Sequence, residues 1–85
     1  MRKVKFSQRR LEKEIMREGQ VLKLHAGAVE IVAGRVAHVL SRWAEGRERD
    51  GKELTQHELD QRVALELKKY NPDLAYLYQH RGRMI

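Results

Sequence analysis

Residues 25–43, HAGAVEIVAGRVAHVLSRW, decide the fold of this 85-residue chain. Apolar side chains return along this stretch at steps of three or four residues, a spacing that keeps them on one side of an α-helix. The apolar positions are Val29, Val32, Val36, Val39 and Trp43, and Ala26, Ala33, Ala37 and Leu40 widen the stripe. The pattern predicts a long helix over about 23–46 with one broad buried side.

Two glycines interrupt this helix, Gly27 and Gly34, seven positions apart. Each costs about 1 kcal/mol relative to alanine inside a helix. Because they fall on the same side, we expect another helix to pack closely against them.

The preceding segment predicts a shorter helix over about 8–18, with Ser7 as its N-cap and Gly19 as its stop. Its apolar stripe consists of Leu11, Ile15 and Met16. The charged residues on its other side alternate in sign, so we expect them to form solvated ion pairs. They are Arg9, Arg10, Glu12, Lys13, Glu14, Arg17 and Glu18.

After the turn signal Asp50-Gly51, the tetrapeptide TQHE at 55–58 is a capping box and opens a helix that runs to about 69. Asn71-Pro72 then starts a last short helix over about 72–81. The expected apolar positions of these two helices are Leu59, Val63, Leu67 and Tyr70, with Ala64 and Leu65 beside them, and then Leu74, Leu77 and Tyr78.

The whole chain is therefore predicted to be a single, compact, all-α domain of four helices. Residues 1–6 form an N-terminal arm or at most one short β-strand, and residues 82–85 form a tail. The formal net charge of +6 favours anionic partners.

The composition also argues against several kinds of protein. There is no cysteine, and the four scattered histidines do not match a metal site. No apolar run approaches the ~20 residues of a membrane span, so we expect a cytoplasmic protein without membrane association. A phosphate-binding glycine loop is missing, and the serines Ser7 and Ser41 have no evident catalytic base. We therefore expect a protein that is not an enzyme.

The order of the segments resembles the ATP-cone, the small regulatory domain of ribonucleotide reductases and of their nucleotide-dependent repressor. The similar stretches are FSQRRL at 6–11, HAGAVEIVAGRVAHVL at 25–40 and ELTQHELDQRVALELKKYNPDLAYLYQHR at 53–81. The Val-x-Lys-Arg-Asp-Gly hairpin that carries the family's phosphate contacts is absent, and only Arg10 falls on a matching position of the first helix. The resemblance implies a shortened cone whose nucleotide binding is lost or altered.

The resulting expectation is a regulatory binding module that takes a nucleotide, ATP or dATP, or an acidic partner. Phosphates would be held by Lys3, Lys5, Arg9 and Arg10. The exposed edge at residues 2–6 would pair with a second copy, which makes a homodimer.

Two alternatives are a nucleic-acid-binding protein and an adaptor that docks on a larger assembly. In the first, aromatic and cationic side chains of the last helix and the tail face outward, stack on bases and contact phosphates. These side chains are Tyr76, His80, Arg81 and Arg83.

Overall fold

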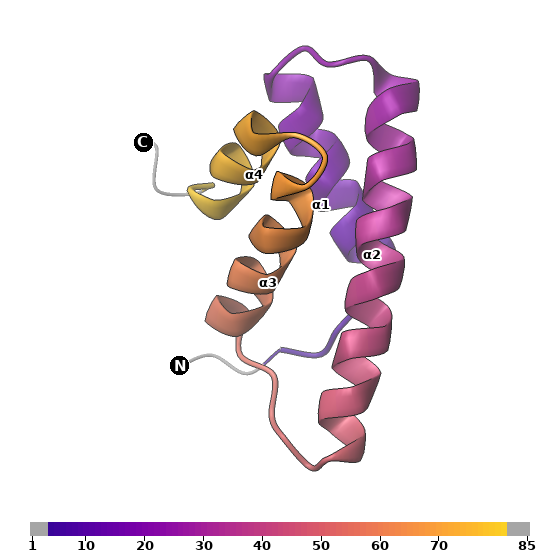
Figure 1. Ribbon diagram of the computed structural model, residues 1–85, viewed down its shortest axis with the longest axis vertical. Helices are drawn as coiled ribbons and strands as arrows, with labels where there is room; N and C mark the ends of the chain where they lie inside the picture. Colours follow the sequence, from indigo (N-terminus) through magenta and orange to yellow (C-terminus); the bar gives the residue numbers. More distant parts are fainter. Residues whose placement is uncertain (1–3, 82–85) are drawn as a thin grey trace.

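The computed structural model describes residues 4–81, which form the four helices α1 (Gln8–Val21), α2 (Ala26–Arg49), α3 (Gln56–Lys68) and α4 (Pro72–Gln79). Within these residues there is no β-strand, so the predicted all-α, four-helix fold is confirmed. Lys3 and Arg83 lie outside the described residues. Figure 1 shows α1 and α2 as an antiparallel hairpin, with α3 and α4 packed on one side of it. At 39 × 28 × 19 Å, the molecule is about two helix layers thick.

The core draws side chains from every helix. The largest side chains with less than 2 % of their surface exposed are Ile15, Val36, Leu40, Val63, Leu67, Leu74 and Tyr78. The prediction that Val39, Leu65 and Tyr70 belong to the buried stripes is wrong, because 42 %, 57 % and 44 % of their surfaces are exposed. Ala26 is also exposed, and Val32, Trp43 and Leu77 are half-buried. The other helices cover α2 on one side only, so the edge of its predicted stripe stays in solvent.

Three helices begin at the caps that the sequence predicts. Ser7 accepts a hydrogen bond from the backbone N–H of Arg10, and Thr55 accepts one from that of Glu58. The Asn71 side chain accepts two, from the N–H groups of residues 73 and 74. Just before α1, the Val4 N–H donates to the carbonyl of Leu54 at 2.9 Å, which holds this residue against the segment that leads into α3.

The ends of α1 and α2 share one geometry. At the end of α2, the N–H of Lys52 donates to the carbonyl of Arg47, and Gly51 takes the left-handed conformation with φ +73°. This is a Schellman motif. At the end of α1, the N–H of Leu24 donates to the carbonyl of Gly19, but the left-handed residue is Lys23, with φ +59°.

Gly19 therefore does not stop α1, contrary to the prediction, because the helix continues to Val21. Its glycine is needed for packing: a Cβ there would lie 2.7 Å from a methyl carbon of Val29 on α2. The close approach expected at Gly27 and Gly34 is not found. A Cβ at Gly34 would meet nothing within 4 Å, so the near contact between the two helices is at Gly19 instead.

Candidate phosphate-binding surface

Helix α1 separates its charges by side. Its cationic residues are all exposed, whereas two of its three acidic residues turn toward the rest of the protein: Glu14 is half-buried and Glu18 is 9 % exposed. The third, Glu12, is half-buried at the edge of the exposed side. The exposed cations are Arg9, Arg10, Lys13 and Arg17. A helix of nearly balanced composition therefore presents a positive surface to solvent.

Three of these cations form a line. Arg9, Lys13 and Arg17 are four residues apart, so they lie along one side of α1, with a rise of about 6 Å between successive side chains. None of the three forms an ion pair within residues 4–81. Like charges at this spacing repel each other. We call Arg9, Lys13 and Arg17 the basic face.

The prediction of mutually neutralising ion pairs on α1 is wrong for the basic face. Within the described residues, the one ion pair inside α1 joins Arg10 and Glu14, with 3.5 Å between Nε and Oε1. Glu14 lies on the side of the helix that faces α3 and α4, so the pair leaves the basic face unneutralised.

Lys23 adds a cation just beyond the end of α1. It is exposed, and it holds a backbone conformation in which a non-glycine residue costs roughly 1–2 kcal/mol. A lysine at a position that favours glycine is the kind of local conflict that often marks a functional residue.

The residues expected to hold a nucleotide are not gathered in one place. Lys5 and Arg10 line a hollow of about 350 Å³, whose other lining residues are Val4, Ser7, Leu11, Glu14, Gln56 and Leu59. Arg9 lies on another side of α1, where it lines a second hollow together with Glu12, Lys13 and Met16 of α1 and Glu30, Ala33 and Gly34 of α2. Of the predicted phosphate-binding residues, Lys5 and Arg10 thus lie at the hollow of about 350 Å³, and Arg9 lies on the basic face.

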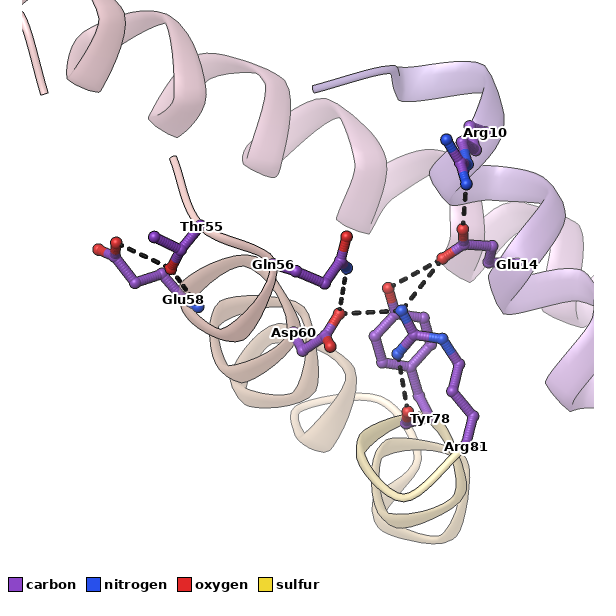
Figure 2. A network of polar contacts seen from close by, with 8 residues as sticks. All are labelled: Arg10, Glu14, Thr55, Gln56, Glu58, Asp60, Tyr78 and Arg81. Carbon is purple, nitrogen blue, oxygen red and sulfur yellow. Dashed lines mark hydrogen bonds and ion pairs between the residues drawn. The ribbon is translucent and has the colours of Figure 1, made fainter. Parts of the chain in front are cut away.

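Arg81 does not face outward, contrary to the prediction. Figure 2 shows its guanidinium between carboxylates of two helices: Nη2 lies 2.9 Å from Asp60 Oδ1 on α3 and 3.3 Å from Glu14 Oε2 on α1. Nη1 donates to the Tyr78 carbonyl oxygen at 2.9 Å, and the guanidinium stacks 3.8 Å from the centre of the Tyr78 ring. This cation is neutralised inside the protein. We call Arg81, Glu14, Asp60 and Tyr78 the junction.

The junction also perturbs the titration of its members. Burial raises the pKa of the Tyr78 hydroxyl well above its ordinary value, and the hydrogen bond that this hydroxyl donates to Glu14 acts in the same direction. Burial acts to lower the pKa of Arg81, but its interactions with Tyr78, Asp60 and Glu14 outweigh it, so that the pKa is raised. Both side chains therefore keep their protons throughout the neutral range.

Arg47 is a second structural cation. Its Nη2 atom lies 2.7 Å from Glu58 Oε2 and donates to the carbonyl oxygen of Glu53 at 3.0 Å. Arg47 and Arg62 both lie over the ring of Trp43. These contacts join the end of α2 to the start of α3. No local pattern around Arg47 predicts that its side chain is held in this way.

Tyr76 faces outward as predicted, with 62 % of its surface exposed. Its ring lies 4.4 Å from that of His80, which is half-buried. Because Arg81 belongs to the junction, Tyr76 and His80 do not form the expected aromatic and cationic cluster with Arg81.

The sequence analysis missed Lys13, Arg17 and Lys23 as site residues. The four-residue spacing of Arg9, Lys13 and Arg17 can be read from the sequence, but the sequence does not show which neighbouring glutamates pair with cations outside α1.

In residues 4–81 there is no group of three side chains able to hold a metal ion. No helix in this range is long and apolar enough to cross a membrane.

Comparison of the chain with family models, with curated proteins and with solved structures gave no match. The resemblance to the ATP-cone therefore stays a prediction.

Proposed function

We propose that this protein is a non-catalytic nucleic-acid-binding protein that contacts the phosphate backbone through the basic face of α1. The observation that carries the proposal is the separation of charge on α1, where all four cations are exposed while Glu14 and Glu18 turn inward. Lysine and arginine side chains supply most of the affinity of proteins for nucleic acid, because each phosphate contact releases condensed counterions.

The shape of the basic face favours a polymer over a small ligand. Its three cations extend along about 12 Å of an exposed helix, which suits a line of phosphates. Contacts of this kind carry no information about base sequence. We therefore expect binding to duplex DNA that depends strongly on salt and weakly on sequence.

We further propose that the protein acts as a homodimer through the outer side of α2. This side carries residues at alternating steps of four and three, the spacing of a helix–helix seam. They are Ala28, Val32, Arg35, Val39, Arg42 and Gly46. A two-fold axis through such a seam would give each dimer two basic faces, and so more phosphate contacts.

The test is binding of the full chain to a duplex of about 20 base pairs, by fluorescence anisotropy between about 50 and 200 mM salt. We expect the triple variant R9Q/K13Q/R17Q to bind more weakly. If each cation contacts one phosphate, the slope of log K against log salt falls by about 3 per protomer.

A matched control removes three other cations that are exposed and form no ion pair within residues 4–81, in the variant R49Q/K52Q/K68Q. The proposal requires the α1 triple to lose clearly more affinity than this control. Equal losses would mean that only net charge matters, and no binding at the lowest salt would reject the proposal. Sedimentation of the wild type and of Val39→Glu tests the dimer, which the substitution should weaken.

A second candidate function is nucleotide binding by a cone-like regulatory module, and the hollow beside Lys5 and Arg10 favours it. A hollow of about 350 Å³ falls within the usual size range of ligand sites. Lys5 and Arg10 would hold phosphates, and Val4, Leu11 and Leu59 would contact the base.

A thermal melt with ATP and with dATP tests this candidate. A nucleotide at 100 times its Kd should add about 2.7 kcal/mol of stability, and the variant K5A/R10A should lose that gain. Absence of any shift with either nucleotide rejects the candidate and leaves the nucleic-acid proposal untouched.

A further inference from the structure

A groove runs between α3 and α4, away from the basic face. Its volume is about 520 Å³. Each helix lines it with four residues spaced i, i+3, i+4 and i+7, so each contributes a continuous stripe. The lining residues are Gln61, Ala64, Leu65 and Lys68 on α3, and Pro72, Ala75, Tyr76 and Gln79 on α4.

The shape of the groove follows from the sizes of these side chains. Ala64 and Ala75 are buried, at 7 % and 5 % exposure, and form a shallow floor. Leu65 and Tyr76 are 57 % and 62 % exposed and rise beside it. A floor of small residues between large apolar ones lets the ridge of another helix settle between α3 and α4.

The charges around the groove point to the kind of helix it accepts. None of its eight lining residues is acidic, and Lys68 supplies a positive charge. In a two-fold contact between two such grooves, the Lys68 side chains of both copies would lie in the interface, with no acidic lining residue to offset either charge. A helix with carboxylates beside its apolar stripe would instead complement Lys68.

We propose that the groove between α3 and α4 binds an acidic amphipathic helix of a partner protein. Apolar side chains of that helix pack on Leu65 and Tyr76, and a carboxylate pairs with Lys68. This mode of recognition, in which the apolar side of a helix enters a groove, is common among binding modules. The groove shares no residue with the basic face, so the proposal is independent of nucleic-acid binding.

The probe is a displayed library of amphipathic helices of about 18 residues, roughly five turns. Half of its members carry Glu and half carry Lys beside identical sets of apolar positions. The full chain is the bait, and the best binder is then measured by titration. We expect enrichment of Glu-flanked helices, and a loss of about 30-fold or more in affinity with Leu65→Glu or Tyr76→Glu. Lys68→Glu should reverse the preference for acidic flanks.

Val21→Glu is the matched control, because Val21 is an equally exposed apolar residue, at 62 %, on α1. It should leave peptide affinity unchanged, and thermal melts should show that every variant is folded. Four results would each overturn the proposal: no enriched helix, enrichment of Lys-flanked helices, binding that survives Leu65→Glu, or a homodimer that Leu65→Glu dissociates. The last would assign the groove to a second copy.

Discussion

The basic face and the junction use the same kind of side chain in opposite ways. At the junction, Arg81 lies between Glu14 and Asp60, and its side chain is 23 % exposed. On the basic face, Arg9, Lys13 and Arg17 are exposed and have no ion-pair partner within residues 4–81. The difference teaches that an arginine becomes structural when a neighbouring helix brings a carboxylate to it, and stays available to a ligand otherwise.

The two regions are connected through α1. Glu14, on its inner side, accepts a hydrogen bond from Tyr78 and pairs with Arg81. Because the junction uses this carboxylate, Glu14 is not free to neutralise the basic face. The stability of the fold and the positive surface thus depend on the same inward turn of the acidic side chains.

The largest expected effect comes from removing the cation of the junction. Arg81→Ala removes the cation between Glu14 and Asp60 and leaves two partly buried carboxylates without it. This should lower the free energy of unfolding by about 2–3 kcal/mol. Urea denaturation measures it. Arg9→Ala is the control and should change stability by less than about 0.5 kcal/mol. Equal losses of stability in the two variants would contradict the conclusion that Arg81 stabilises the fold and Arg9 does not.

The next effect depends on pH and on Tyr78. Its folded-state pKa lies above the unfolded value of 10.0, so the folded protein keeps this proton longer. The stabilisation is fully present below pH 10.0 and is lost as the pH rises above it, with a slope of at most about 1.4 kcal/mol per pH unit.

Tyr78→Phe should cost about 1 kcal/mol at neutral pH through the lost hydrogen bond, and should also remove this alkaline slope. Unfolding curves from pH 8 to pH 11 compare the two proteins, and the exposed Tyr76→Phe serves as control. If both variants keep the slope of the wild type, Tyr78 is not the group responsible.

A smaller effect is expected at the end of α1. Lys23→Gly relieves the left-handed backbone of a non-glycine residue, and should stabilise the protein by roughly 1 kcal/mol. If Lys23 also contacts phosphate, the same substitution should weaken DNA binding. A gain in melting temperature with no change in DNA affinity would assign Lys23 no part in binding.

The smallest expected effect on stability tests the basic face directly. Lys13→Glu places a carboxylate four residues from both Arg9 and Arg17, which should stabilise α1 by about 0.2–0.5 kcal/mol per pair. DNA affinity should nevertheless fall, because the substitution neutralises the face. Lys13→Gln separates the loss of a cation from the gain of ion pairs, and should bind DNA better than Lys13→Glu.

Much of the fold was predictable because its signals are local. Each N-cap side chain accepts a hydrogen bond from a backbone N–H three residues further along the chain, at Ser7, Thr55 and Asn71. The sequence alone therefore locates these helix starts. The end of α1 was misplaced because Gly19 fits two roles, a helix stop and a packing contact. Its contact is with Val29, on another helix, and no local pattern reveals it.

By itself, the sequence determined four helices, the N-caps of three of them and an excess of positive charge, because each depends on composition or on residues within a turn of one another. Only the tertiary structure decided which charges remain exposed. Arg81 meets its partner Glu14 across 67 positions of the chain, and Asp60 across 21. Helical periodicity gives the side of a helix on which a residue lies, but the packing of the helices determines what lies opposite it.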